Sequence, residues 1–476
     1  MQRREFIKRT SVGATALAAK EMWEHFTPSE TLANVRGGGL DIEEAVEMIE
    51  LGKVKNVMPE IRSEITNNPR AVFLIETHVS ARPDSRGFFE EARPQMEETG
   101  KEIAKSIFVK GSKKGGSTLI KPNFTHCPDD VWSPISGVIT SPDFIAGFVE
   151  SLREMGNTNT VVSERGGTTP NHRGTGIYSV LDKKDIPLIE ASYANFKYYR
   201  KDELNWHKVP DPVVWKNIPT YRPVGDKDNL FINMPKLKNH NLGLTTLSIK
   251  NLQGAVPLGY GQYCWSWESI PFLAKKEDNI NFKRDFATDY QERVEAAFLK
   301  HRAAGFKYWD YEQSYPKYEA KGGWEAFKKI KDDNKAVGEF MKGIPRLMWD
   351  EQWCQRALDS HSALPQSLNI IEGVIGRDGS GFNTGTDQLC NIVIVGLSRP
   401  EVDTVGSYVM GQNAKELYYT RIAKERGMGE DDPEKIDIFW IKNDEVVPVK
   451  RLAEIKQYKL GVNIHTWSET GERLFW

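Results

Sequence analysis

The chain has 476 residues, with 64 Lys or Arg against 66 Asp or Glu, and a formal net charge of −2. This length is about three times that of a usual ~150-residue domain, so it predicts one large elaborated domain or about two to three smaller ones. The balanced charge argues against binding of nucleic acid through bulk positive charge. No run of about 18 apolar residues follows the N-terminus, so we expect no membrane span in the mature chain.

The N-terminus carries an export pattern. Gln2–Lys8 reads QRREFIK, with paired arginines, then Phe, an aliphatic residue and Lys, as in twin-arginine signals. A weakly apolar stretch, Thr10–Ala19, follows and contains Ala16-Leu17-Ala18, an A-x-A-like cleavage site. We expect residues 1–30 to be a signal read by the twin-arginine translocation machinery, and the protein to be periplasmic or extracellular. The alternative is a basic, amphipathic start to a cytosolic protein.

Residues 31–257 alternate apolar runs of strand length with helical patterns, as parallel sheets do. We predict strands at Ala71–Val79, Ser117–Phe124, Thr160–Ser163, Pro187–Ala191 and Leu230–Met234. Helical patterns occupy Asp41–Ile65, Asp84–Val109 and the segment from Pro142 to about Met155. The last of these has Ser141 as its N-cap and ends at Gly156. Residues 192–228 are polar, aromatic and irregular, which predicts a surface excursion.

The amino-acid composition changes at residue 258. Residues 258–364 are rich in Gly, Tyr and Trp and then in charged helical patterns, so we interpret them as a mainly helical, aromatic insertion or cap. Residues 365–476 resume the core, with strands at Ser367–Glu372, Cys390–Gly396 and Ile436–Ile441 and a helix at Pro400–Lys424. The apolar run CNIVIVG suits a central strand. The predicted fold class is α/β: a Rossmann-like, three-layer arrangement around a mostly parallel sheet, interrupted by the insertion.

Four predicted loops follow apolar strands and carry reactive side chains. They are Lys121–Asn123 with His126 just beyond, Glu164–Arg165 leading to His172, Lys236–His240 with Lys250-Asn251 on the next helix, and Glu372–Asp378. Loops at the carboxyl ends of parallel strands share one edge of a doubly wound sheet, so these four can meet. Lysines hold carboxylate or phosphate oxygens, and histidine moves protons near neutral pH. The pattern therefore predicts a pocket that binds a small anionic molecule.

We assign predicted roles on that basis. The predicted catalytic residues are His240 as acid or base, Lys238, and Glu372, with Glu372 or Asp378 as the group that orients His240 or a metal. The substrate-binding residues are Lys121, Asn123, Lys236, Lys250, Asn251, Arg165 and Asp378. His126 and His172 are the candidate ligands of a possible divalent metal, although no H-E-x-x-H spacing supports it. For each residue alone the alternative is a solvated loop lysine or a hydrogen-bonded structural histidine.

The four cysteines are far apart in the chain. Cys127, Cys264, Cys354 and Cys390 include no C-x-x-C pair, so we expect no iron–sulfur cluster and no zinc ribbon. An oxidising compartment permits one or two disulfides, and buried free thiols are the alternative.

Three stretches resemble one protein family. Ile120–Asn123, Ile232–His240 (INMPKLKNH) and Thr245–Gly254 (TTLSIKNLQG) are similar to the signature of the domain of unknown function 362. The resemblance runs from about Ser117 to Met410 and keeps the family's two lysines and its histidine at Lys236, Lys238 and His240. It implies an α/β fold and a shared polar pocket, and no particular reaction.

Two functions remain open from the sequence. The first is an exported enzyme that acts on a small carboxylate- or phosphate-bearing substrate, with or without a metal. The second is a non-catalytic periplasmic protein that binds a ligand or cofactor or assists assembly.

Overall fold

The computed structural model describes residues 42–53, 55–124, 136–164, 177–190, 204–240, 243–257, 290–306, 311–331, 333–344, 348–379, 381 and 385–461. All of them belong to one compact unit, Leu40–Trp476. The predicted export segment lies outside the described residues. Within the described part, no helix has both the length and the apolar character needed to cross a membrane.

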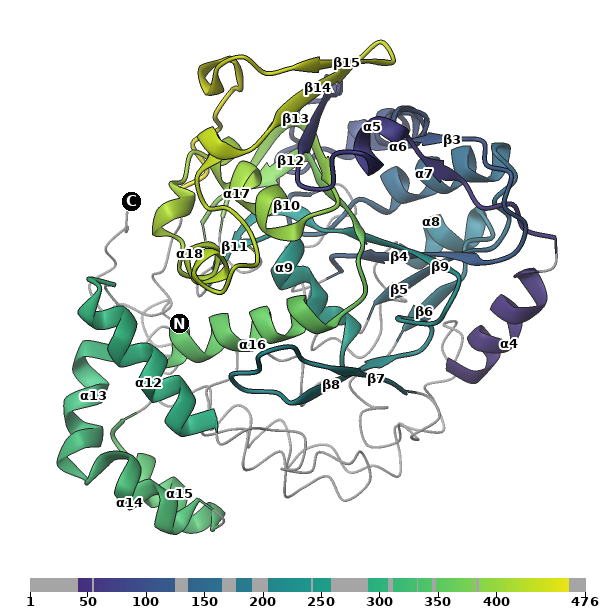
Figure 1. The fold of residues 1–476 in the computed structure, drawn as a ribbon. Coiled ribbons are helices and arrows are strands. Elements are labelled where there is room, and N and C mark those ends of the chain that lie inside the picture. Colours follow the sequence, from purple (N-terminus) through teal and green to yellow (C-terminus); the bar gives the residue numbers. More distant parts are fainter. Residues whose placement is uncertain are drawn as a thin grey trace, which may run out of the picture. The chain divides into compact units, whose positions relative to one another are not determined.

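A large mixed sheet is the centre of this unit (Figure 1). Its main path runs in the order β15-β14-β2-β13-β12-β9-β4-β5-β6, and β10 is attached to β12 and β11. The strands are β2 (Val72–Glu76), β4 (Ser117–Pro122), β5 (Thr160–Glu164), β6 (Leu188–Glu190), β9 (Asn229–Met234), β10 (Lys236–His240), β11 (Leu244–Thr246), β12 (Leu368–Arg377), β13 (Asp387–Gly396), β14 (Ile438–Lys442) and β15 (Glu445–Pro448). Two small ribbons pair β1 (Glu60–Ile61) with β3 (Phe108–Val109) and β7 (Leu204–Lys208) with β8 (Asn217–Tyr221).

Most neighbouring strands in the sheet are parallel. The pairs β12–β9, β9–β4, β4–β5, β5–β6 and β14–β2 all run in the same direction. Strand β13 is central, as its apolar sequence predicted, but it is antiparallel to both β12 and β2. The predicted α/β class with a mostly parallel sheet is confirmed.

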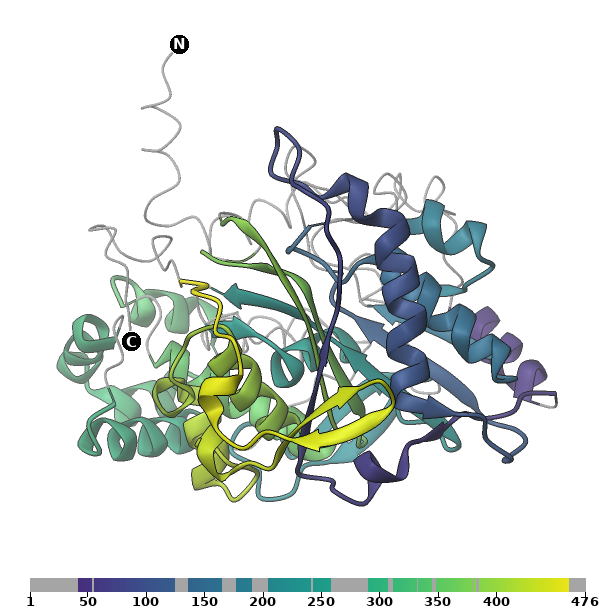
Figure 2. The same cartoon turned by 90° about the horizontal axis from the view of Figure 1, so that it is seen from above.

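The helices form layers on the two faces of the sheet (Figure 2). They are α4 (Ile42–Lys53), α5 (Ser63–Thr66), α6 (Arg93–Ile107), α7 (Pro142–Glu154), α8 (Ile177–Lys183), α9 (Ser248–Asn251), α12 (Tyr290–Ala303), α13 (Tyr311–Ala320), α14 (Gly323–Ile330), α15 (Asn334–Met341), α16 (Trp349–Ala363), α17 (Arg399–Val409) and α18 (Tyr418–Glu425). Helix α7 begins as predicted, because the Ser141 hydroxyl accepts a hydrogen bond from the Phe144 N–H at 3.3 Å.

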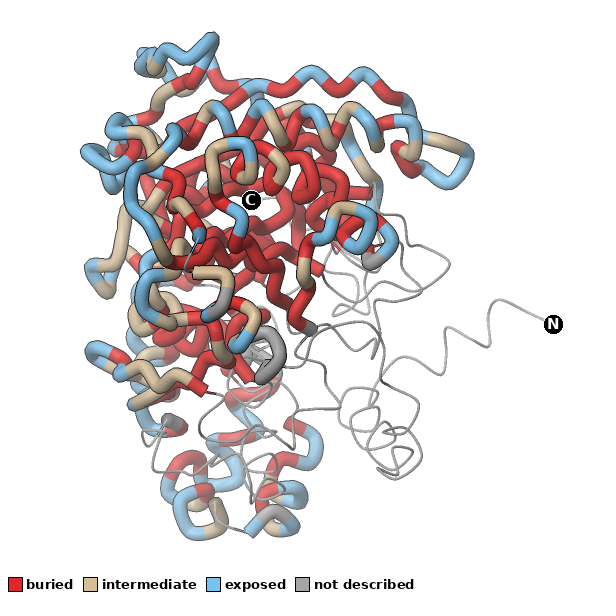
Figure 3. Tube along the Cα trace, turned by 90° about the vertical axis from the view of Figure 1, so that its right-hand side faces the viewer, coloured by how far each residue is buried: buried red, intermediate tan, exposed pale blue. Residues whose placement is uncertain are grey.

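Alternating side chains along the strands explain the layers. On β4, Leu119 and Ile120 point to opposite faces and join different hydrophobic clusters. One face packs against α6, α7 and α8, whereas the other packs against α17 in one half and against α9, α16 and the β7–β8 ribbon in the other half. Because these elements cover both faces, most residues in the interior of the sheet are buried (Figure 3). This is why strands such as β2 and the second half of β13 are apolar.

Three expectations from the sequence are wrong in detail. Lys236–His240 is a strand and not a loop, since it pairs with both β11 and β12. Strand β12 continues through Glu372 to Arg377, so Glu372 lies inside a strand. Residues 204–221 are not an irregular surface excursion, because they form the β7–β8 ribbon and bury Trp215 and Tyr221.

The described part of residues 258–364 is helical and packs onto the core. His301 on α12 lies between the Glu351 carboxylate on α16, at 2.8 Å, and the Glu425 carboxylate on α18, at 2.9 Å. Burial lowers the pKa of His301, but the hydrogen bonds and charges of Glu351 and Glu425 outweigh it and raise the pKa overall. The imidazole therefore joins the three helices through its two hydrogen bonds.

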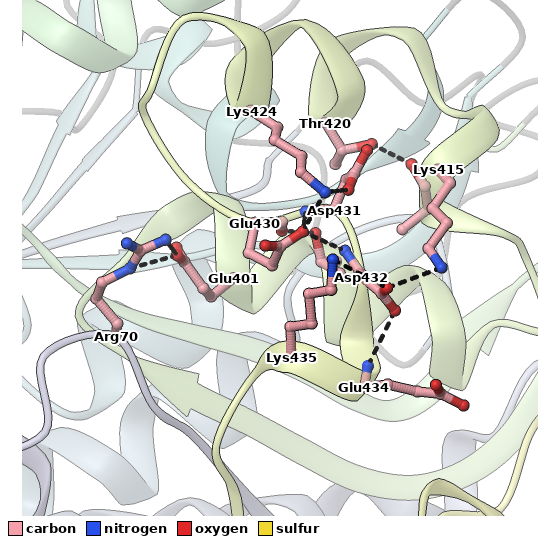
Figure 4. A network of polar contacts seen from close by, with 12 residues as sticks. Arg70, Glu401, Lys415, Thr420, Lys424, Glu430, Asp431, Asp432, Glu434 and Lys435 are labelled. Carbon is pink, nitrogen blue, oxygen red and sulfur yellow. Dashed lines mark hydrogen bonds and ion pairs between the residues drawn. The ribbon is translucent and has the colours of Figure 1, made fainter.

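A network of ion pairs holds the loop after α18 (Figure 4). The Lys424 ammonium contacts the carboxylates of Glu430 and Asp431, each at 2.6 Å, and Lys415 contacts Asp432 at 2.9 Å. The acidic residues Glu430–Asp432 are thus paired with Lys415 and Lys424. These pairs indicate that the acidic run stabilises the loop.

Candidate functional site

The predicted site residues gather at the carboxyl edge of the parallel strands. Lys121 on β4 lies opposite Asn233 on β9, and Pro122 lies opposite Met234. After Pro235 the chain enters β10, where Lys236 lies opposite Glu372 of β12. Lysines and carboxylates from four strands therefore share one edge, which is where open α/β sheets bind ligands.

Lys121 forms a buried ion pair with Glu164 at the end of β5. Its ammonium donates to the Glu164 carboxylate at 2.6 Å, to the Pro122 carbonyl at 2.6 Å and to the Asn251 side-chain oxygen at 3.2 Å. The Phe124 N–H also donates to the same carboxylate, at 3.2 Å. Because both side chains are almost fully buried, this charge is neutralised by a protein partner.

Lys236 and Glu372 form a second buried pair. The Lys236 ammonium donates to Glu372 Oε2, which also accepts the Ser141 N–H at 3.3 Å, while Glu372 Oε1 accepts the Val374 N–H at 3.0 Å. Glu372 is therefore held from three directions and connects β10, β12 and the start of α7.

Strand β10 presents alternate residues to the site. Lys236, Lys238 and His240 share one face, whereas Leu237 joins the hydrophobic cluster under α17 and Asn239 binds the carbonyls of Leu460 and Gly461. The Lys238 ammonium donates to the Val138 carbonyl at 2.6 Å. The loop before α7 thus lies against the lysine-bearing face of β10.

His240 is buried and electrically neutral at ordinary pH. Burial lowers its pKa well below the usual value, and the nearby charges of Lys250 and Lys238 lower it further. Its Nδ1 accepts the Gly243 N–H at 3.1 Å, so the neutral ring carries its proton on Nε2. His240 is therefore a hydrogen-bond donor through Nε2.

Lys250 differs from the other three lysines. It lies on α9, is only half-buried, and its ammonium has neither a carboxylate partner nor a hydrogen-bond acceptor within the described residues. Its charge nevertheless lowers the pKa of His240. It is thus the predicted lysine whose charge a ligand would meet without displacing a protein partner.

Asn123 and Asn251 belong to a row of buried asparagines, which we call the asparagine relay. Asn123 donates to Asn251 at 3.2 Å, Asn251 donates to Asn233 at 2.8 Å, and Asn233 donates to Asn369 at 3.0 Å. The relay joins β4, α9, β9 and β12. It fixes both predicted asparagines to the framework of the sheet.

The other predicted residues are placed less centrally or not described. The Asp378 carboxylate accepts the Thr386 N–H within the loop between β12 and β13, and no described contact joins it to the lysines. Arg165, His126 and His172 lie outside the described residues, as do Cys127 and Cys264. Cys354 and Cys390 are buried free thiols. The described residues contain no cluster of His, Cys, Asp or Glu that would suit a metal ion.

Two residues that support the site were not singled out from the sequence. Asp403 on α17 accepts the N–H groups of Ser248 and Ile249, at 2.6 and 2.9 Å, and so positions the start of α9. Burial raises the pKa of Asp403 to about 7. Gly254, just beyond α9, lies so close to the Lys121–Glu164 pair that any side chain would collide with it. Gly254 closes the family-like stretch Thr245–Gly254, but its role, like that of Asp403, depends on distant partners.

Comparison with known proteins gives one match. The family model described as "Domain of unknown function (DUF362)" matches residues 118–408, which is more than half of the chain. No curated protein and no solved structure matches significantly. The matched region contains β4, β10 and α9, which carry the four lysines and His240. It also contains Asn123, directly after β4, and Asn251 on α9. The chain belongs to the DUF362 family of domains of unknown function.

Proposed function

We propose that this protein is an exported enzyme that binds a small carboxylate- or phosphate-bearing substrate at the carboxyl edge of its sheet, beside Lys238, His240 and Lys250. The observation that carries the proposal is Lys250: a half-buried ammonium without an acceptor in the described part of the chain, next to a buried imidazole. A cation in such a position attracts an anion more strongly than one in open water.

The two buried ion pairs have a different role in this proposal. Lys121 and Lys236 already contact carboxylates, so binding a substrate anion to either would require rearranging a buried pair. We assign them to holding β4, β5, β10 and β12 in register around the pocket. Glu372 would then position Lys236 and the N–H of Ser141.

His240 supplies the chemistry. Its Nε2–H would donate to an oxygen of the substrate and stabilise negative charge that develops there, as a neutral imidazole does when its pKa is low. A bound anion would also offset the lysine charges that depress the pKa of His240. Because Nδ1 is occupied by the Gly243 N–H, proton transfer is proposed to run through Nε2.

Binding is tested by calorimetry of the purified mature protein with acetate and with inorganic phosphate. We expect Lys250→Met and His240→Gln each to weaken anion binding about tenfold, the usual worth of one charge-assisted hydrogen bond. Lys105→Met is the matched control, because it removes the same charge from an exposed ion pair on α6. Equal affinities in all four proteins would overturn the proposal.

A non-catalytic carrier is the alternative, and His240→Gln together with Lys238→Ala separates the two. In an enzyme, His240→Gln abolishes turnover, while the fold remains and the affinity falls only about tenfold. In a carrier, the main effect is a loss of affinity in Lys238→Ala. Metal analysis of the same sample tests whether a divalent ion contributes.

A further inference from the structure

The hydrogen bonds of the asparagine relay all run in one direction, which is fixed at the end formed by Asn369. The Asn369 amide nitrogen lies against three backbone carbonyls, those of Ser367, Gly396 and Leu397, at 3.1 to 3.2 Å. Carbonyls only accept hydrogen bonds, so this position must be the NH₂ group. The Asn369 oxygen is therefore the atom that faces Asn233.

Each following amide is then forced into one orientation. The Asn233 NH₂ donates to Asn369 Oδ1 and to the Ser248 carbonyl, so Asn233 Oδ1 must accept from Asn251. Asn251 in turn presents its oxygen to the Lys121 ammonium, which can only donate, and to the NH₂ of Asn123. Two independent restraints, the carbonyls at one end and the lysine at the other, agree on the same direction.

The last atom of the relay is Asn123 Oδ1, an acceptor to which no described residue donates. Asn123 is only 9% exposed, and within the described residues no group donates to this oxygen. A buried polar atom left unpaired costs free energy, so native proteins pair such atoms with water or a ligand. Flipping the Asn123 amide would not help, since it would set two oxygens against each other at Asn251.

The residue that carries this oxygen is tied to the loop that Lys238 contacts. The Asn123 backbone N–H donates to the Thr140 hydroxyl at 2.9 Å, and its carbonyl accepts the Thr140 N–H at 3.0 Å. The same loop receives the Lys238 ammonium at the Val138 carbonyl. A group bound near Lys238 thus meets lysine donors together with one amide acceptor.

We infer that the ligand is an anion that also carries an uncharged hydrogen-bond donor, a hydroxyl group, which donates to Asn123 Oδ1. This inference rests on the proposed function and specifies its substrate class: hydroxy acids or hydroxylated phosphate esters. An oxygen of a plain carboxylate would be repelled by Asn123 Oδ1, and an ammonium donor would be repelled by the lysines. Asn123 is then the specificity-determining residue, and Lys250 and His240 supply the affinity.

The experiment compares three small carboxylates by calorimetry on the wild-type protein: glycolate, methoxyacetate and acetate. Glycolate has a hydroxyl donor, methoxyacetate has the same oxygen without its hydrogen, and acetate has neither. We expect glycolate to bind about tenfold more tightly than either analogue, because only glycolate pairs the buried acceptor. Equal affinities for the three overturn the inference.

The variant Asn123→Ala should bind glycolate and methoxyacetate with nearly equal affinity. Asn239→Ala is the matched control: it removes an asparagine from the opposite face of β10, and we expect it to keep the preference for glycolate. A preference that persists in Asn123→Ala overturns the inference. If the wild type binds all three anions alike in a Lys250-dependent way, only the inference fails. If it binds none, the proposed function fails as well.

Discussion

The ammonium of Lys236 and the carboxylate of Glu372 lie opposite each other on neighbouring parallel strands, and both side chains are 0% exposed. Removing one partner leaves a buried charge without compensation. We expect Glu372→Gln to lower the free energy of unfolding by about 3–5 kcal/mol. Urea unfolding measures this. The exposed pair of Lys105 and Glu154 is the control, and Glu154→Gln should cost less than about 1 kcal/mol. Similar costs for the two variants would contradict the importance of the buried pair.

The depressed pKa of His240 makes the free energy of unfolding depend on pH. Its folded-state pKa is depressed, so the unfolded chain binds a proton as the pH falls below about 6.5, while the folded protein does not. The associated stability is complete above that pH and is lost on acidification, by up to about 1.4 kcal/mol per pH unit. The difference in free energy of unfolding between the wild type and His240→Gln should therefore shrink from pH 8 to pH 5. A constant difference would refute the depressed pKa.

Gly254 predicts a steric effect on the site. A Cβ atom there would lie 2.5 Å from the Lys121 ammonium and would collide with the Glu164 carboxylate. We expect Gly254→Ala to destabilise the fold and to weaken anion binding, because the pair must move. Gly338→Ala in α15 is the control: its Cβ meets nothing within 4 Å, and it should be neutral or stabilise by roughly 0.5–1 kcal/mol. Thermal melting and calorimetry measure the two effects.

His301 predicts the opposite dependence on pH. Its pKa is raised overall, so its contribution is complete below the unfolded-state value of about 6.5 and is lost as the pH rises through the folded-state value. Glu351 and Glu425 face the imidazole, and Lys300 contacts Glu425 at 3.1 Å. His301→Gln should be most destabilising at pH 6 and less so at pH 9, as followed by urea unfolding. An equal effect at both values would show that the imidazole acts only by packing.

The export proposal predicts a strict requirement for both arginines. In a bacterial host with the twin-arginine pathway, the double variant Arg3→Lys/Arg4→Lys should accumulate in the cytoplasm with its full precursor length. Arg9→Lys keeps the same charge outside the pair and should be exported normally. Cell fractionation and mass measurement distinguish the outcomes. Export of the double variant would leave the segment without its proposed role.

Local patterns predicted the apolar strands well, because burial on both faces of a sheet demands continuous apolar residues. Strand β10 was predicted as a loop, because Lys236, Lys238 and His240 have polar side chains that are rarely buried. Their burial depends on partners far along the chain: Glu372 is 136 residues from Lys236. Such pairings cannot be deduced from spacing alone.

The length of β12 was underestimated for a related reason. Residues 372–378 were predicted as a loop, but in the structure Gly373 and Gly376 allow neighbouring strands to approach closely. A Cβ at Gly373 would lie 2.8 Å from the Ile392 carbonyl, and one at Gly376 would lie 2.9 Å from the Cys390 sulfur. Within the site, the convergence of the lysines followed from their positions at strand ends. The pairing of Lys121 with Glu164 and of Lys236 with Glu372 could be found only from coordinates. The same holds for the lack of a described acceptor at Lys250.

The single direction of the asparagine relay has an evolutionary consequence. The orientation of the amide at Asn123 is fixed twice: by carbonyls beyond Asn369, on the other side of β9, and by the Lys121 ammonium at Asn251. A change at position 369 alone would leave the hydrogen-bonding sense at Asn123 in place, whereas changes at positions 369 and 121 together would remove both restraints and alter which molecules are accepted, with Asn123 itself unchanged. Family members that diverge in substrate need not differ in the residues that touch it.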